Sequence, residues 1–277
     1  MPMRLSLLGI VLTVTCASAL ADETYTFHES LKPGDKIACE VSSDDHEKTT
    51  TTTKDQPPDK QDLVTRQSLK YEETIIAAKD GSATRLNCKV SAGSDSTKTA
   101  DMPETVTPSP YVGQDVILQR HPDEAVTDDF NGKADPMDSD LLRSVLNPDQ
   151  DFFPDKPVAV GDTWDVTDKV KKHSDFEKGD KVKIICRLDW VKSVEGKRMA
   201  QIVATQDSES RSADQQVTKS HMESILLVDV AAGMIVKIDM TQQSTYSAPD
   251  APVQMTGSGE VTFHGTAVKL EGDAAKP

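Results

Sequence analysis

The sequence predicts an all-β protein with large antiparallel sheets, in the form of a curved sheet or half-barrel, and one short linking helix. Residues 68–78, 83–90 and 181–194 alternate between apolar and polar side chains, a period that is typical of half-buried strands. Two such segments end at an acidic residue followed by glycine, Asp80-Gly81 and Glu195-Gly196, which indicates hairpins. A single segment has helical periodicity, so strands dominate the expected fold.

Residues 1–21 have the parts of a secretory signal peptide. Arg4 supplies a positive charge, residues 5–16 form an apolar run, and Ala19-Leu20-Ala21 is a small-x-small cleavage site. The run is too short for a stable bilayer anchor. We expect cleavage after Ala21 and export to the periplasm or the extracellular space, with no transmembrane anchor left. Lipidation at Cys16 is the weaker alternative, because the residue before it is not small.

The chain is acidic, with 46 Asp and Glu against 31 Lys and Arg and a formal net charge of −15. This charge repels phosphate backbones and anionic lipid surfaces, so no nucleic-acid partner is expected. Solubility is the simplest role of the charge. Attraction of cations or basic partners is the alternative.

Two stretches of the chain share an order of features, which predicts two related β units. Each opens with Gly-Asp, at Gly34-Asp35 and Gly161-Asp162, and each reaches a D-x-x-x-G motif after its hairpin, at Asp128 and at Asp229. The expected organisation is a signal peptide (1–21), a first β unit (22–135), a helix and linker (136–156) and a second β unit (157–277).

The first unit is the longer one, and its excess lies in two low-complexity stretches. Residues 42–60 contain five consecutive threonines, and residues 91–110 are rich in Ser, Thr and Pro. Such compositions predict surface loops, so deletion of residues 44–59 is expected to cost little stability. The alternative for the threonine run is an exposed edge strand, because threonine suits a pleated surface.

The remaining elements follow from periodicity and turn residues. A short helix begins at Pro136 or Asp138 and ends at Asn147-Pro148, with an apolar stripe between them. Strands are expected over 163–167, 181–194, 199–205 and 234–240, and a last hairpin turns at Gly257-Ser258-Gly259.

Three cysteines remain after cleavage: Cys39, Cys88 and Cys186. Each alternates with apolar neighbours, which places it on the core face of a strand. If Cys39 and Cys88 lie on neighbouring strands, oxidation on export can join them in a disulfide. Three inert core thiols are the alternative, because cysteines on non-adjacent strands are too far apart to bond. The spacing of the cysteines does not favour a zinc or redox site.

Residues 152–164 read F-F-P-D-K-P-V-A-V-G-D-T-W. They resemble the motif P-V-x-V-G-D-x-W of an uncharacterised family of exported bacterial proteins, in which the motif begins the second of two β-rich halves after a short helix. The resemblance implies this architecture and assigns no activity or ligand. In physical terms, Pro157 favours an extended entry, Gly161-Asp162 forms a turn, and Trp164 anchors the core. Trp164 as a ligand-stacking residue is the alternative.

No catalytic, cofactor-binding or metal-ligating residue is predicted. Asp44-Asp45-His46-Glu47 has ligand-type residues, but a solvated charge run in a loop is the better interpretation. The segment from Thr127 to Asp138 partly matches a calcium loop, yet it lacks the first aspartate, so an Asx-rich turn is preferred. Gly257-Ser258-Gly259 is too short for a nucleophile elbow.

The sequence therefore predicts an exported non-catalytic binding or envelope-interaction protein without a cofactor, whose partner is an unknown protein or an apolar small ligand. The alternative is an extracytoplasmic hydrolase whose active-site residues converge from distant positions. A curved sheet with a helix on its concave face would resemble periplasmic lipoprotein or lipid carriers at the level of the fold. Such a carrier needs an apolar cavity, and with aromatic residues at 4% the nine methionines are the candidates to line it.

Overall fold

The computed structural model describes residues 23–53, 56–100, 102–121, 126–130, 149–172, 176, 179–211, 216–248 and 254–270. In these ranges strands predominate, accompanied by a 3-10 turn, η2 (Asp149–Phe152), and one short helix, α2 (Thr167–Lys171). The predicted fold class, an all-β protein with a large antiparallel sheet and a short helix, is confirmed. The helix expected near residues 136–147 lies outside the described residues.

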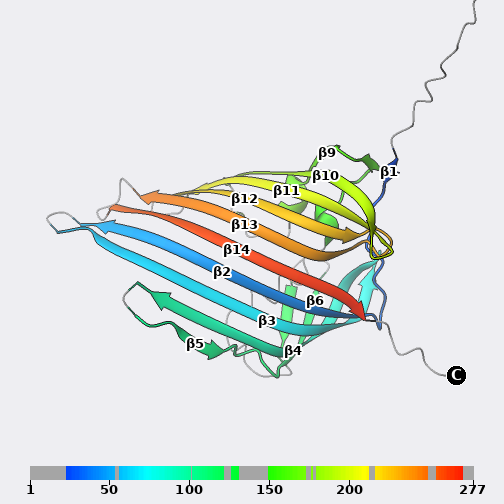
Figure 1. Cartoon of the computed structure of the whole chain (residues 1–277), viewed down its shortest axis with the longest axis horizontal. Coiled ribbons are helices and arrows are strands. Elements are labelled where there is room, and N and C mark those ends of the chain that lie inside the picture. Colours follow the sequence, from blue (N-terminus) through cyan, green and yellow to red (C-terminus); the bar gives the residue numbers. More distant parts are fainter. Residues whose placement is uncertain are drawn as a thin grey trace, which may run out of the picture.

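Twelve strands form one antiparallel sheet, in the order β7-β6-β4-β3-β2-β14-β13-β12-β11-β10-β9, with β5 paired to β4 beside this path (Figure 1). The strands are β2 (Lys36–Thr52), β3 (Asp59–Lys79), β4 (Ser82–Thr99), β5 (Thr105–Pro108), β6 (Asp115–Arg120), β7 (Val126–Asp129), β9 (Thr163–Asp165), β10 (Lys181–Val194), β11 (Lys197–Arg211), β12 (Val217–Asp229), β13 (Met234–Ala248) and β14 (Gln254–Leu270). A separate two-stranded sheet pairs β1 (Thr24–Tyr25) with β8 (Val158–Ala159).

The two predicted units are parts of one continuous sheet. β14, the last strand of the chain, pairs with β2 from Leu270↔Lys36 to Gln254↔Thr52. The short β1–β8 pair also links the N-terminal segment to the start of the second predicted unit. Both units therefore share one long surface, whose middle strands are β2 and β14.

The predicted surface loops are wrong, because both low-complexity stretches contribute strands. Residues 42–52 continue β2, and residues 91–99 continue β4. The threonine run is not an edge strand either, since β2 is hydrogen-bonded to β14 on one side and to β3 on the other. This pairing satisfies the backbone from Thr49 to Thr51 on both sides, and threonine fits such a pleated surface well. Deletion of residues 44–59 would thus remove the outer half of β2 and take this partner away from the outer part of β3.

The Gly257-Ser258-Gly259 segment is also not a turn, since it lies inside β14. Gly257 sits between Tyr246 on β13 and Thr49 on β2. A Cβ atom at Gly257 would overlap the ring of Tyr246. The glycine is needed because an aromatic ring lies across the strand, a known way to cover a glycine in a sheet.

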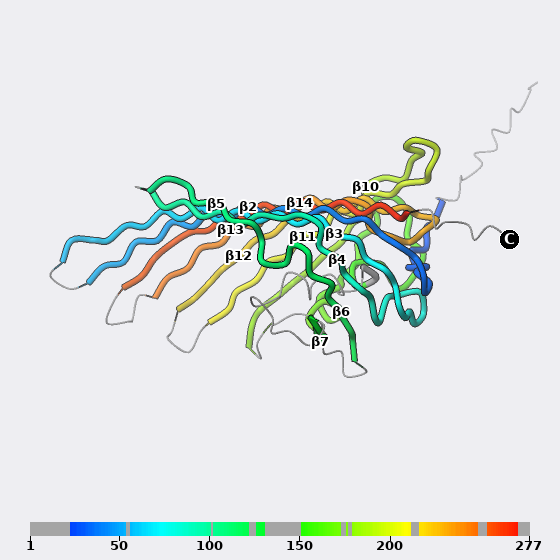
Figure 2. Tube along the Cα trace, turned by 90° about the horizontal axis from the view of Figure 1, so that it is seen from below, coloured from blue at the N-terminus to red at the C-terminus, as the bar shows by residue number. Residues whose placement is uncertain are grey.

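The sheet is twisted and curved, and its concave face carries two apolar cores. Figure 2 shows β6 and β7 on the concave side of the long strands. In the first core Leu69 and Tyr71 pack with Tyr111 and Phe130, beside β6 and β7. In the second core, residues of β10, β11 and β12 pack against Phe27 and Phe153. Both cores lie at the end of the sheet where the N-terminal segment crosses.

Residues 28–32, which we call the N-terminal strap, cross the ends of two hairpins. The N–H of Leu31 donates to the carbonyl of Gly81 at 2.8 Å, and Ser30 Oγ donates to the carbonyl of Ala232 at 2.8 Å. Gly81 belongs to the turn between β3 and β4, and Ala232 to the turn between β12 and β13. The strap thus joins the two halves of the protein at one end of the sheet.

The two Gly-Asp segments that suggested a repeat have the same local geometry. Asp35 accepts a hydrogen bond from the N–H of Lys32 at 2.9 Å, and Asp162 accepts one from the N–H of Ala159 at 2.8 Å. Gly34 and Gly161 have φ of 90° and 94°, in the region that favours glycine. The predicted turn at Gly161-Asp162 therefore has a counterpart directly before β2.

All three described cysteines carry free thiols. Cys39 lies opposite Tyr71 on β3, and Cys88 on β4 lies opposite Glu73 on β3. With β3 between them, β2 and β4 are about 9.5 Å apart, beyond the reach of a disulfide. The condition for the bridge between Cys39 and Cys88, neighbouring strands, is not met. Burial raises the pKa of all three thiols, that of Cys186 to about 12.

Thiol titration should find three free thiols per mature chain in denatured, unreduced protein. In the native state these thiols should react slowly with an alkylating reagent, because the thiolate is the reactive form and burial disfavours it. A single free thiol after denaturation would show that a bridge forms and that the strand order near Cys39 and Cys88 differs.

Candidate functional site

The convex face of the sheet carries cross-strand ion pairs. Lysine and arginine side chains face carboxylates along its strands, in the pairs Lys36–Glu72, Lys70–Glu40, Arg66–Asp44 and Lys181–Glu209. Three histidines lie against aspartates in the same way, in the pairs His46–Asp62, His221–Asp207 and His264–Asp239. Their side chains are mostly exposed, so each pair contributes little to stability. A shallow hollow of about 300 Å³ lies between His221 and His264 on this face, and both histidines are already hydrogen-bonded to carboxylates.

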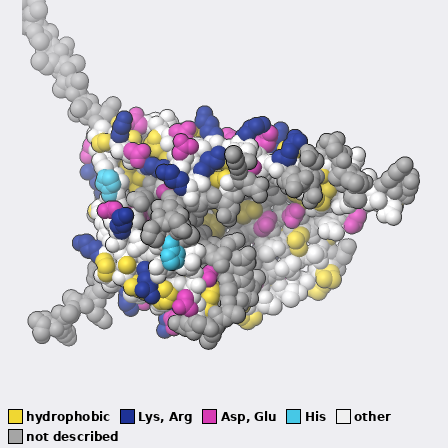
Figure 3. Space-filling model, turned by 180° about the vertical axis from the view of Figure 1, so that it is seen from behind, with side chains coloured by type: hydrophobic (Ala, Val, Ile, Leu, Met, Phe, Trp, Pro, Cys, Tyr) yellow, Lys and Arg dark blue, Asp and Glu magenta, His cyan; other side chains and the backbone are white. Residues whose placement is uncertain are grey.

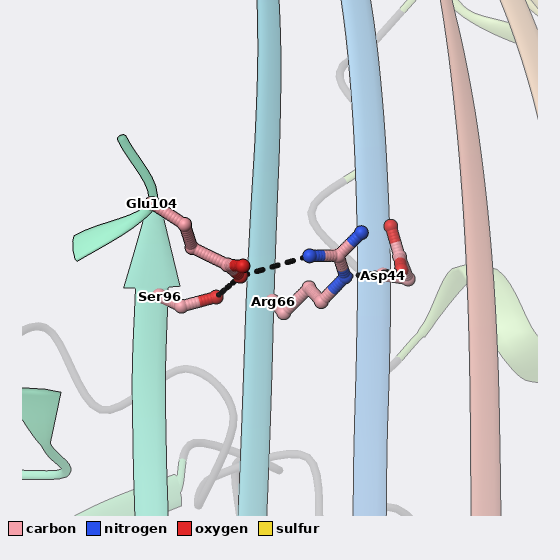
Figure 4. A network of polar contacts seen from close by, with 4 residues as sticks. All are labelled: Asp44, Arg66, Ser96 and Glu104. Atoms are coloured by element: carbon pink, nitrogen blue, oxygen red, sulfur yellow. Dashed lines mark hydrogen bonds and ion pairs between the residues drawn. The ribbon is translucent and has the colours of Figure 1, made fainter. Parts of the chain in front are cut away.

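The most extensive of these networks surrounds Arg66 (Figure 4). Arg66 Nε donates to Asp44 at 2.7 Å, and its Nη1 donates to Glu104 Oε1 at 2.8 Å. Ser96 Oγ donates to the same oxygen of Glu104 at 2.8 Å. These hydrogen bonds, from Ser96 and from Arg66, lower the pKa of Glu104. The network joins β2, β3, β4 and the residue directly before β5. It therefore holds these strands together, which is a structural role.

The concave face has a different chemistry, which changes along the strands. Next to the two cores lies a group that we call the apolar band: Met222 on β12, Met240 on β13, and Val261 and Phe263 on β14. Met240 is directly opposite Phe263, and Gln242 lies between Met222 and Val261. The four side chains are half-buried and belong to neither core cluster.

Farther toward the strand tips the concave face becomes polar and holds a groove of about 420 Å³. We call this the outer groove. Its polar lining is Glu47, Thr49, Thr51, Gln61, Gln216 and Tyr246, and Leu63 and Met255 complete it. Seven of these residues come from β2, β3, β13 and β14 and share one face of the sheet by strand register, and Gln216 directly precedes β12.

Tyr246 is the central side chain of the outer groove. Because Gly257 has no side chain, the ring of Tyr246 lies across β14 and reaches β2. Its hydroxyl donates to Glu47 Oε1 at 2.7 Å and contacts the hydroxyl of Thr49. Thr49 also donates to Glu47 Oε1, at 3.3 Å. The glycine therefore allows a phenol to hold a carboxylate in place two strands away.

The concave face is acidic, without basic side chains in its groove. None of the residues that line the outer groove is Lys or Arg. Among the described residues, none of the ion pairs involves Asp45, Glu47 or Asp95, which all face the concave side. Burial and the nearby Glu47 carboxylate raise the pKa of Asp45, and burial raises that of Asp95. Figure 3 shows this side as a hollow with white, yellow and magenta atoms and with dark blue toward its margins.

The charged segment Asp44-Asp45-His46-Glu47 is not a loop, because it lies within β2 and alternates between the two faces. Asp44 and His46 point to the convex side, where they pair with Arg66 and Asp62. Asp45 and Glu47 point to the concave side. Within the described ranges no three His, Cys, Asp or Glu residues are grouped as a metal site would require. Of the calcium-like segment, Thr127 lies in β7, and residues 131–138 lie outside the described ranges.

The P-V-x-V-G-D-x-W segment lies beside the second core. Trp164 is half-buried against that core, and its indole N–H donates to the carbonyl of Phe152 at 2.9 Å. Asp162 and Gly161 form the turn described above, and Pro157 is exposed beside β8. The segment lies away from the outer groove. Its strand β9 is at the far edge of the sheet and pairs only with the middle of β10, whereas the groove is lined by β2, β3, β13 and β14.

One buried carboxyl that sequence reasoning missed lies in the first core. Glu73 is 8% exposed and faces Cys39 and Cys88 on the flanking strands. Cys39 Sγ donates to Glu73 Oε1 at 3.5 Å. Burial raises the pKa of Glu73 to about 7, against the smaller opposite effect of the Cys39 hydrogen bond. Only the core-facing position of Glu73 in the alternation of residues 69–75 signals this burial.

Comparisons with known proteins give no family. No protein-family model matches the chain, and no curated protein matches it. Among solved structures, lipovitellin, in a structure that describes its lipid–protein interactions, has 9% identity and a TM-score of 0.49 over 89% of this chain. The chain spans about a quarter of lipovitellin, 26%. A LolA superfamily protein from Nitrosomonas europaea has 8% identity and a TM-score of 0.22, covering 89% of this chain and 92% of its own.

The described part of the chain contains no helix with the length and hydropathy needed to cross a bilayer.

Proposed function

We propose that this protein is an exported, non-catalytic binding protein that holds an apolar or amphipathic small molecule against the concave face of its sheet. Export is supported by the signal-peptide features of residues 1–21. The observation that carries the proposal is the separation of chemistry between the two faces. The cross-strand pairs of basic and acidic side chains named above lie on the convex face, whereas the apolar band and the outer groove lie on the concave face.

The position of the apolar band supports this function. Its four side chains are half-buried on a concave surface, beyond the packing of either core. Small-molecule sites are typically concave and largely apolar, with a few polar groups that fix orientation. Two of the four are methionines, whose flexible side chains adapt to the shape of a ligand. The band therefore provides the apolar part of such a site, and the outer groove its polar part.

The polarity gradient also favours an elongated ligand. Along β14 the concave positions run from Gly265 in the core region through Phe263 and Val261 to Gly259 and Gly257. At about 3.4 Å per residue, the path from Phe263 to Gly257 is about 20 Å long. An amphiphile that lies along this path places its chain on the apolar band and its head in the outer groove.

Binding of an uncharged fluorescent long-chain alcohol should distinguish the two faces. Phe263→Gln places a polar amide in the apolar band and should weaken binding by about tenfold, the effect of losing most of one buried aromatic contact. Thr262→Gln introduces the same residue at the neighbouring position, which faces the convex side. This control should change the affinity less than twofold. Equal effects of the two variants, with both proteins folded by circular dichroism, would contradict a concave site.

A further inference from the structure

The outer groove has a chemistry that selects among head groups. Its polar lining presents hydroxyls, amides and one carboxylate, and no residue that lines it is basic. Both hydrogen bonds that Glu47 receives, from Tyr246 and from Thr49, go to Oε1. Among the described residues no hydrogen bond reaches Oε2, so this oxygen can accept one from a ligand.

The surroundings of Glu47 strengthen this selection. Asp45 lies two residues from Glu47 on the same face of β2. Asp95 also faces this side, on β4, opposite Gln67 of β3. The basic residue beside Glu47 in the sequence, Lys48, points to the convex face, as does Lys60 across from Thr50. A negative group in the groove would face carboxylates without a compensating cation, which is unfavourable on a partly desolvated surface.

We infer that the outer groove takes the amine or ammonium head group of an amphiphile, with Glu47 Oε2 as its direct acceptor and Tyr246 as the residue that positions Glu47. This inference rests on the proposed function, because the chain of the same ligand lies on the apolar band. A protonated amine donates up to three hydrogen bonds. Glu47, Thr51 and Gln61 supply acceptors in this groove. The groove therefore complements a cationic head group in both charge and hydrogen bonding.

Three probes of equal chain length test the head-group preference: dodecylamine, dodecanol and dodecanoate. Each is titrated calorimetrically into the mature protein at pH 7 and low ionic strength, with the amine and the carboxylate below their critical micelle concentrations and the alcohol below its solubility limit. The amine should bind about tenfold more tightly than the carboxylate, the scale of one charge-assisted hydrogen bond. Glu47→Gln should reduce the ratio to less than about threefold and leave dodecanol binding within about twofold.

A matched control separates the groove from the overall negative charge of the protein. Glu260 lies next to Gly259, the residue opposite Glu47, and faces the convex side. Glu260→Gln removes the same charge and should preserve the tenfold preference. Tyr246→Phe should reduce the preference through loss of the hydrogen bond that holds Glu47, without abolishing dodecanol binding.

The outcomes distinguish the two proposals. If none of the three probes binds, the proposed function is contradicted. If all three bind with similar affinity, or dodecanoate binds most tightly, the ligand-binding function stands and the head-group inference is overturned. If Glu260→Gln lowers the preference as much as Glu47→Gln does, the preference reflects net charge and the inference also fails.

Discussion

Gly81→Ala should destabilise the protein by about 3 kcal/mol, whereas Gly196→Ala should cost only about 1 kcal/mol. Both glycines occupy the second position of a two-residue hairpin turn, with φ of 88° and 80°, so both substitutions carry the penalty of roughly 1–2 kcal/mol for a left-handed conformation. At Gly196 a Cβ atom would meet open space. At Gly81 it would overlap the backbone carbonyl of Glu29 in the N-terminal strap, and such overpacking adds about 1–3 kcal/mol.

Equilibrium unfolding in urea measures this difference, because both variants keep the same turn type and the same composition. The contrast isolates the contact between the strap and the β3–β4 turn. Gly233→Ala should resemble Gly81→Ala, since its Cβ would overlap the carbonyl of His28. Equal losses of stability for Gly81→Ala and Gly196→Ala would show that the strap does not press on the hairpin and does not join the two halves of the sheet.

Glu73→Gln should remove a pH dependence of stability of about 2–3 kcal/mol between pH 5 and pH 8. In the folded protein, burial raises the pKa of Glu73 from 4.5 to about 7. As the pH rises from 4.5, the carboxyl of Glu73 ionises first in the unfolded chain. This ionisation lowers the free energy of the unfolded state relative to the folded state. The free energy of unfolding therefore falls as the pH approaches 7, and the loss is complete above that value. Each unit of pKa difference corresponds to about 1.4 kcal/mol.

The measured quantity is the free energy of unfolding of each protein at the two pH values. The difference between the parent protein and Glu73→Gln cancels the contributions of the other titrating groups. Glu72→Gln is the matched control, because Glu72 is the neighbouring residue on the convex face and pairs with Lys36 in solvent. If the parent protein and Glu73→Gln have the same pH dependence, the carboxyl of Glu73 is hydrated and the first core is open near Cys39.

Alternation and turn chemistry were sufficient to predict the class of fold and several strands. β10 spans the predicted residues 181–194. Residues Asp80 and Glu195 have positive φ and precede glycine, as the hairpin prediction requires. These features are local, so they can be identified without knowledge of the partner strands.

The outer halves of β2 and β4 could not be predicted in the same way. Residues 42–52 are polar on both faces, so they have no apolar period, and their composition is that of a loop. They are strands because β3 and β14 supply backbone partners on both sides. Long-range pairing therefore overrides composition here. The predicted turn at Gly257 and Gly259 was wrong for the same reason. These glycines leave room for the side chains of Tyr246 and Ser244 on the neighbouring strand.

The candidate site depends on register and was not predictable from the chain alone. Glu47, Tyr246 and Gln61 are distant in sequence and meet only because β2, β3, β13 and β14 are adjacent with one particular alignment. A shift of one residue would exchange the two faces and place His46 and Lys48 in the groove. Two of the nine methionines, Met222 and Met240, lie in the apolar band, and whether they line a ligand site stays a prediction.

The most direct test of a ligand on the concave face uses tryptophan as a local reporter. Phe263→Trp places the indole in the apolar band, and Thr262→Trp places it on the opposite face of the same strand. Each variant is titrated with a brominated dodecanol, whose bromine quenches a tryptophan that it touches, and the signal of Trp164 and Trp190 is subtracted with the parent protein. We expect saturable quenching of the tryptophan at position 263 and none at position 262. Equal quenching at both positions, or quenching only at position 262, would contradict binding on the concave face.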